Sequence, residues 1–252
     1  MARREFAAVV LDLYDTLVRW DPLQLPEVEW RGRKFRSTDP FQIEILKPRL
    51  GDTFDLERWL DAYHSVVGEI MAERESGETE TTCDERFVRA LTRFGMPPGA
   101  AMAALARELA QVHMGHVRRV TSAPAERVAA VRKIAPHYRL GLLSNFDDSR
   151  TGHDVLSDTG VSHLFEAVII SADVGMRKPN PKIFERMLAM LSLPPGEILF
   201  VGDTPQHDVV GAARVGMRTA WISGGKGTWP DGMPAPDFVI ADLADLPSIV
   251  GL

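Results

Sequence analysis

The sequence has a single cysteine, Cys83, in 252 residues. An internal disulfide is therefore excluded, which is typical of proteins from a reducing compartment. Long apolar runs are also missing. The apolar stretch that begins at Phe6 is interrupted at Asp12, and it is too short for a secretory signal or a membrane span. These absences predict a cytoplasmic protein with no membrane partner.

An excess of positive charge is absent as well. Lys and Arg number 29 against 35 Asp and Glu, which gives a formal net charge of −6. Without a basic footprint we expect no nucleic-acid partner. The composition, 45% hydrophobic and 25% charged, is that of an ordinary globular protein. A chain of this length can form one large domain or a domain with an insert, as a monomer or a homodimer.

Short apolar runs rich in β-branched residues alternate with helical patterns over much of the chain. Strands are predicted at 6–11, 140–143, 167–170, 198–201, 219–222 and 238–240, and helices at 124–135, 151–158, 183–191 and 208–215. Repeated strand–helix units form parallel sheets with both faces covered. The pattern therefore predicts an α/β fold with a Rossmann-like parallel sheet and helices on both faces.

The segment from residue 19 to 120 has a different character. Residues 28–36 alternate around a glycine and predict a hairpin. Three helices are predicted after it: one capped by Asp52 or Thr53 and running to 71, one over 87–94 that Gly95 ends, and one over 99–117. No strand here is long enough to join the central sheet. The sequence therefore predicts a mainly helical insert, 19–120, in a core formed by 1–18 and 121–252.

Polar side chains follow four of the predicted core strands, one of them after a longer loop. Because the carboxyl ends of parallel strands meet at one edge of a sheet, we expect these side chains to converge there. They include carboxylates, a hydroxyl, an amide and a cation, which is a chemically coherent set. The residues are Asp12, Ser144, Asn145, Lys178, Asp203 and Asp208.

These segments resemble the four motifs of the haloacid dehalogenase superfamily of hydrolases. The matching stretches are L-D-L-Y-D-T-L at 11–17, L-L-S-N at 142–145, R-K-P-N-P at 177–181 and V-G-D-T-P-Q-H-D at 201–208. The resemblance covers the whole predicted core, in the order that the family has. It implies that the insert at 19–120 is a C1-type cap domain.

The resemblance also implies roles for the residues at the sheet edge. Asp12 would be the nucleophile of a phosphatase, forming an aspartyl-phosphate that water hydrolyses. Three negatively charged aspartates beside a dianionic phosphate far exceed one lysine, so Mg²⁺ is the expected cofactor. The expected substrate is a small phosphorylated metabolite. The implied phosphate-binding residues are Thr16, Ser144, Asn145 and Lys178, and the implied metal ligands are Asp12, the backbone carbonyl of Tyr14, Asp203 and Asp208.

Tyr14 departs from the phosphatase pattern, which has a second aspartate at this position. A tyrosine with its usual pKa of about 10 is a weak general base at neutral pH, so Asp15 is an alternative acid/base group. Tyr14 resembles the metal-independent 2-haloacid dehalogenases of the same superfamily, but these lack the paired aspartates of the last motif. A further alternative is a catalytically weak protein that binds a phosphorylated ligand.

Two groups in the insert allow two interpretations each. His113 and His116 have helical spacing and could bind a metal, although a helix surface or a contact within the insert is the simpler interpretation. The hairpin cations are Arg31, Arg33, Lys34 and Arg36. They could be solvated or could contact an anionic substrate.

Overall fold

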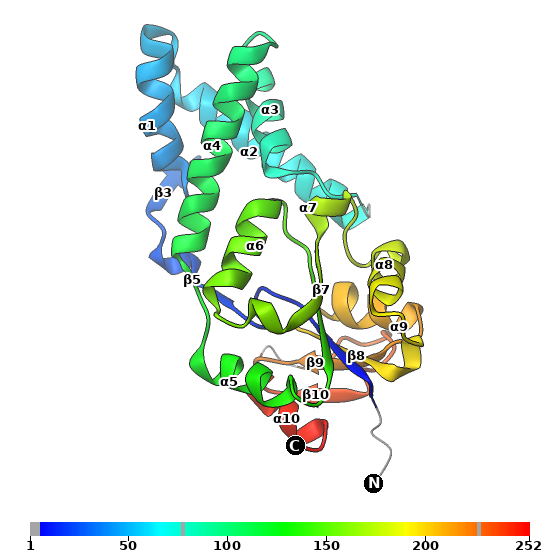
Figure 1. The fold of residues 1–252 in the computed structure, drawn as a ribbon. Helices are drawn as coiled ribbons and strands as arrows, with labels where there is room; N and C mark the ends of the chain where they lie inside the picture. The colour runs from blue at the N-terminus through cyan, green and yellow to red at the C-terminus, as the bar shows by residue number, and fades with distance from the viewer. Residues whose placement is uncertain (1–5, 77–78, 226–227) are drawn as a thin grey trace. The chain divides into compact units, whose positions relative to one another are not determined.

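The computed structural model describes residues 6–76, 79–225 and 228–252, and the chain divides into two compact units (Figure 1). The first comprises Met1–Arg19 and Ser122–Leu252, and the second Trp20–Thr121. Residues 1–5 of the predicted core lie outside the described part. The second unit occupies nearly the residue range of the predicted insert, and its assignment as a cap remains a prediction.

The first unit contains a six-stranded parallel sheet in the order β10-β9-β8-β1-β6-β7. Its central strand β1 lies between β6 and β8, with Val10 level with Gly141 and Phe200. The prediction of a Rossmann-like α/β fold is therefore confirmed. The strands are β1 (Ala8–Leu11), β6 (Arg139–Ser144), β7 (Phe165–Ile170), β8 (Ile198–Gly202), β9 (Arg218–Ile222) and β10 (Phe238–Ile240).

Helices cover both faces of this sheet. One core contains side chains of α5 (Ala125–Ile134), α6 (Ser149–Asp158) and α10 (Leu246–Ile249), and the other contains those of α8 (Pro181–Leu191) and α9 (Gly211–Arg214). Along β1, Val9 and Leu11 enter the first core while Ala8 and Val10 enter the second. Burial on both faces explains why β1 is a continuous apolar run that ends only at Asp12.

The helix predicted to start at Asp208 or to include it begins at Pro205. It starts as a π-helical segment, Pro205–Val210, and continues as α9. Proline suits the first turn of a helix, since it has no N–H to leave unpaired there. Asp208 therefore lies inside the first wide turn and not at the helix start.

The second unit contains a hairpin and four helices. The hairpin prediction is confirmed by β3 (Glu27–Trp30) and β4 (Arg33–Arg36). The helices are α1 (Asp39–Leu50), α2 (Leu56–Ser76), α3 (Cys83–Phe94) and α4 (Ala100–Arg119). Strand β2 (Arg19–Trp20) pairs with β5 (Thr121–Ser122). The remaining short elements of the whole chain are α7 (Ser171–Val174) and the 3₁₀ turns η1 (Pro22–Gln24), η2 (Gly51–Thr53), η3 (Ser162–Leu164), η4 (Pro195–Glu197) and η6 (Leu243–Asp245).

Two helical predictions for this unit were wrong in detail. Helix α1 was not predicted, because it contains Pro48 and lacks a clear apolar stripe. Helix α2 is not capped by Asp52 or Thr53, which lie in the 3₁₀ turn before it. Its cap is Asp55, whose Oδ1 accepts a hydrogen bond from the backbone N–H of Arg58 at 3.0 Å.

The second unit has an aromatic core of its own. The ring of Tyr63 on α2 stacks on Phe87 of α3 at 5.4 Å, and Trp59 meets Phe94 edge to face at 5.9 Å. These contacts join α2 to α3. Over the ranges that the structure describes, no helix combines the length and apolar character that crossing a membrane requires.

Candidate active site

Asp12 lies at the carboxyl end of the central strand β1. Its backbone N–H donates to the carbonyl of Val201 at 2.9 Å, which continues the pairing of β1 with β8 for one more residue. Its side chain is 7% exposed. The strand therefore places one carboxylate at the middle of the sheet edge, between the ends of β6 and β8.

Lys178 is almost completely buried, with 1% of its surface exposed. Its Nζ lies 2.6 Å from Asp12 Oδ1, 2.7 Å from Asp208 Oδ1 and 2.8 Å from the carbonyl oxygen of Leu143. The contacts with Asp12 and the Leu143 carbonyl are hydrogen bonds, and the contact with Asp208 is an ion pair. Burial disfavours the charged amine, but the two carboxylates outweigh it and raise the pKa of Lys178. Lys178 is therefore a fixed positive charge.

Asn145 holds Lys178 in place through the main chain. Its Oδ1 accepts a hydrogen bond from the Lys178 N–H at 2.7 Å, and its Nδ2 donates to the Lys178 carbonyl at 2.9 Å. Both ends of this side chain are thus engaged with one residue. The structure favours a positioning role for Asn145 over the direct phosphate contact that the sequence led us to expect.

Asp208 is held from both sides. One carboxylate oxygen, Oδ1, faces Lys178, and the other accepts the backbone N–H of Thr204 at 2.8 Å. Gly202, the last residue of β8, makes room for it: a Cβ at this position would lie 2.4 Å from Asp208 Cγ. A side chain larger than hydrogen at residue 202 therefore cannot coexist with this placement of Asp208.

Among the described residues, Asp12, Asp203 and Asp208 form a cluster of carboxylates that could hold a metal ion. Each offers a carboxylate oxygen, and these oxygens lie within 4.8 Å of one another. Burial raises the pKa of Asp12 to about 7; Lys178 opposes this, and Asp208 and Asp203 add to it. Three carboxylates against one lysine leave negative charge to be compensated. This oxygen-only donor set fits Mg²⁺, which binds a few carboxylates and retains waters.

Two buried hydroxyls lie at the same sheet edge. Ser144 is the last residue of β6, and Thr16 lies in the turn where the N–H groups of Leu17 and Val18 both donate to the Leu13 carbonyl. Neither Ser144 Oγ nor Thr16 Oγ1 has a hydrogen-bond partner among the described residues. Buried hydroxyls usually have one, so these two donors are available to a bound ligand.

Tyr14 and Asp15 lie on the same turn. The Tyr14 ring stacks on Phe146, with centroids 4.7 Å apart, and Asp15 adopts a left-handed conformation with φ of 58°. The Asp15 side chain lines a pocket of about 300 Å³ together with Asp203 and Arg127. Both residues thus remain candidates for acid/base catalysis, and mutation can separate them.

Sequence reasoning missed one supporting residue on the neighbouring strand. Trp221 on β9 donates its Nε1–H to the backbone carbonyl of Asp203 at 3.0 Å. Trp229 packs edge to face against Trp221, with centroids 5.2 Å apart. An isolated tryptophan at a strand end carries no sequence signal for this contact, because the contact is to a main-chain atom.

The other sequence candidates have structural partners in the second unit. His113 Nδ1 lies 2.6 Å from Thr38 Oγ1, whereas His116 stacks on Phe41. The two histidines thus have separate surroundings. Among the described residues, neither belongs to the carboxylate cluster that could hold a metal ion. Among the hairpin cations, Arg31 pairs with Asp61, Lys34 and Arg36 lie within 4 Å of Glu27, and Arg33 is exposed.

Comparisons with known proteins agree with the motif pattern. The HAD-hydrolase-like family model matches residues 175–246. Phosphoserine phosphatase of Thermus thermophilus is 29% identical over 94% of this chain and 96% of that protein. Glyceraldehyde 3-phosphate phosphatase of Pyrococcus abyssi is 36% identical over 41% of this chain and 43% of that protein.

Two solved structures are similar over 98% of both chains. They are a 2-haloacid dehalogenase from Pseudomonas syringae, with a TM-score of 0.71 and 22% identity, and a HAD phosphatase from Thermococcus onnurineus, with a TM-score of 0.65 and 24% identity. At these identities the likeness concerns the fold.

Proposed function

We propose that the chain is a hydrolase of the haloacid dehalogenase superfamily and, within it, a Mg²⁺-dependent phosphatase of a small phosphorylated metabolite. The observation that carries the proposal is the buried contact of Asp12 with Lys178 beside two further aspartates. Full-length similarity to a phosphoserine phosphatase supports this choice over other hydrolases of the superfamily.

Asp12 is the nucleophile in this proposal. Lys178 binds its Oδ1, so we assign the attack on phosphorus to Oδ2. The attack forms an O–P bond and breaks the ester O–P bond, and the departing oxygen takes a proton from Tyr14 or Asp15. Water then gives a proton back to that group and attacks the phosphorus of the aspartyl-phosphate, which breaks the bond between phosphorus and Asp12 Oδ2, releases phosphate and restores Asp12.

The surrounding side chains stabilise charge on the transferring group. The free hydroxyls of Thr16 and Ser144 donate to phosphoryl oxygens, and the fixed ammonium of Lys178 offsets the negative charge that develops. Asn145 keeps Lys178 in position through two hydrogen bonds to its main chain. These groups are oriented before substrate arrives, so little reorganisation accompanies the reaction.

The metal would be held by Asp12, Asp203 and the Tyr14 carbonyl. When bound, Mg²⁺ would neutralise the carboxylates and polarise the phosphoryl group. Asp208 pairs with the Lys178 ammonium through Oδ1 and accepts the Thr204 N–H through Oδ2, so we assign it a contact with the metal through water. The second unit is proposed as the C1-type cap that selects the substrate and excludes water.

The experiment is turnover of p-nitrophenyl phosphate in Mg²⁺ and in EDTA, by the wild type and by Asp12→Asn. We expect hydrolysis only for the wild type with Mg²⁺. Hydrolysis that persists in EDTA or in Asp12→Asn would contradict the proposal. Saturable phosphate binding that requires Mg²⁺, with no product, would support the alternative of a binding protein.

Tyr14 is the observation that favours a second candidate, a 2-haloacid dehalogenase. That activity would need no metal and would release halide from a 2-haloacid in the presence of a chelator. The three clustered carboxylates argue against it, since they repel a carboxylate substrate unless a cation is bound. Absence of halide release by the chelated enzyme would eliminate this candidate.

A further inference from the structure

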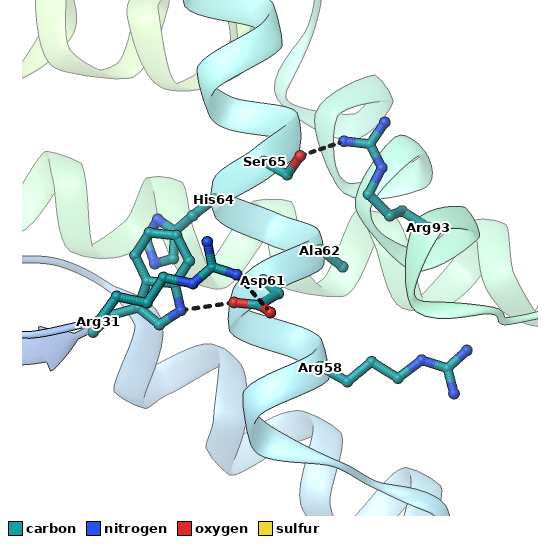
Figure 2. Close-up of a pocket in the computed structure, with 8 residues that line it drawn as sticks. Arg31, Arg58, Asp61, Ala62, His64, Ser65 and Arg93 are labelled. Atoms are coloured by element: carbon teal, nitrogen blue, oxygen red, sulfur yellow. Dashed lines mark hydrogen bonds and ion pairs between the residues drawn. The ribbon is translucent and has the colours of Figure 1, made fainter.

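A pocket of about 430 Å³ lies entirely within the second unit (Figure 2). Helix α2 forms one wall with residues 58, 61, 62 and 65, whose spacing places them on one face of the helix. The hairpin β3–β4 and helix α3 complete the lining. The pocket is lined by Trp30, Arg31, Arg58, Asp61, Ala62, His64, Ser65 and Arg93.

Three arginines line this pocket with one carboxylate, Asp61. Arg31 lies 2.9 Å from Asp61 Oδ2, and Arg93 binds both oxygens of Glu69, which is outside the lining. Arg58 has no carboxylate partner among the residues that the structure describes; its guanidinium lies over the Phe94 ring at 5.4 Å, and Figure 2 marks no hydrogen bond or ion pair to it. Three guanidinium groups and two carboxylates leave one positive charge uncompensated.

Two of the guanidinium groups, those of Arg31 and Arg93, have contacts that orient them. Arg93 also donates to Ser65 Oγ at 2.8 Å, and the Arg31 guanidinium lies over the ring of Trp30 at 4.8 Å. Trp30 in turn donates its Nε1–H to Asp61 Oδ1 at 3.1 Å. A ligand that binds here would therefore meet donors that are already oriented, which reduces the entropic cost of binding.

Arg31 breaks a local preference of the hairpin turn. Arg31 and Gly32 link β3 to β4 with φ of 50° and 73°, and a two-residue turn of this kind favours Asn or Gly at its first position. An arginine accepts some backbone strain there. Local rules are most often broken at functional sites, and the broken rule here places a cation at the mouth of the pocket.

We propose that this pocket binds the phosphoryl group of a small anionic ligand. Guanidinium groups form paired hydrogen bonds with phosphate oxygens, and the unpaired Arg58 would supply the additional charge. The Arg31 guanidinium already lies over the Trp30 ring, so this face of the ring is not open to stack on a ligand. Recognition therefore does not require an aromatic group on the ligand. The site lies within the second unit, and the proposal does not depend on the phosphatase activity.

The test is calorimetric titration of the full chain with inorganic phosphate in EDTA, at constant ionic strength. Under these conditions Asp12, Asp203 and Asp208 have no metal ion and outnumber the single Lys178, so the candidate active site repels phosphate. We expect one saturable site in the wild type and binding at least about tenfold weaker in Arg58→Gln. Arg107→Gln is the matched control, because Arg107 is an exposed arginine of the same unit outside the pocket.

Further arms identify the source of the phosphoryl group. Glycerol phosphate binding more tightly than inorganic phosphate would assign the site to a phosphate ester, and the reverse order to free phosphate. Arg58→Lys should retain part of the affinity because it keeps the charge. The proposal is overturned if the wild type shows no saturable binding, or if Arg58→Gln and Arg107→Gln bind phosphate equally.

Discussion

Replacing Asp12 by asparagine should stabilise the metal-free protein at neutral pH while it abolishes activity. The pKa of Asp12 is raised from 3.8 to about 7, mainly because its carboxylate is buried. Each pKa unit corresponds to about 1.4 kcal/mol, so ionising Asp12 in the folded protein lowers the free energy of unfolding by about 4 kcal/mol. Asparagine cannot ionise and avoids this loss.

The direction of the pH dependence follows from the raised pKa. The folded protein holds the Asp12 proton more tightly than the unfolded chain, so the stabilisation is complete below about pH 4. It is lost as the pH rises from about 4 to about 7. Asp12→Asn should therefore gain stability relative to the wild type across this range, because Lys178 keeps its contacts with Asp208 and the Leu143 carbonyl.

The assay is urea unfolding in EDTA at several pH values between 4 and 8, followed by circular dichroism. Asp231→Asn serves as the control, since it removes an exposed carboxylate outside the site. We expect the advantage of Asp12→Asn to grow with pH and to level off above pH 7, at a few kcal/mol. An Asp12→Asn protein no more stable than the wild type at pH 8 would refute the electrostatic reasoning.

Three further substitutions test the supporting geometry. Gly202→Ala should lower the free energy of unfolding by about 1–3 kcal/mol and weaken Mg²⁺ binding, because its Cβ would lie 2.4 Å from Asp208 Cγ. An unchanged midpoint of urea unfolding and an unchanged calorimetric affinity for Mg²⁺ would contradict this. Asn145→Ala should lower kcat at least about tenfold through loss of the Lys178 clamp, with little change in KM; an unaltered kcat would remove the positioning role. Tyr14→Asp should raise turnover of alkyl phosphates by up to about a hundredfold and that of aryl phosphates less, since alkyl leaving groups depend more on a proton donor. Equal effects on both substrates would eliminate residue 14 as the group that protonates the leaving oxygen.

The parallel sheet was predictable because its strands are apolar runs buried on both faces. Polar residues that follow such runs meet at one edge whatever the intervening chain does, and Asp12, Ser144 and Lys178 could be assigned to it on that basis. Helix α1 was not predictable in the same way. Its Pro48 and weak apolar stripe conceal a helix that tertiary packing stabilises.

Site details that depend on main-chain atoms were also beyond the sequence. The clamp of Asn145 on Lys178 and the contact of Trp221 with the Asp203 carbonyl both involve backbone groups. Sequence patterns report residue types, so Asn145 was first interpreted as a phosphate ligand. The proposed phosphoryl-binding pocket of the second unit was also beyond the sequence. Its arginines are separated by up to 62 positions, from Arg31 to Arg93, and only folding brings them together.

The central claim is that Asp12 forms an aspartyl-phosphate during turnover. Borohydride reduces such an acyl phosphate and converts the aspartate to homoserine, which peptide mass spectrometry can locate. Treating the wild type with Mg²⁺, substrate and borohydride should convert Asp12 to homoserine, and omitting substrate should leave it unchanged. Phosphate release with an unmodified Asp12, or with homoserine at a different aspartate, would contradict the account.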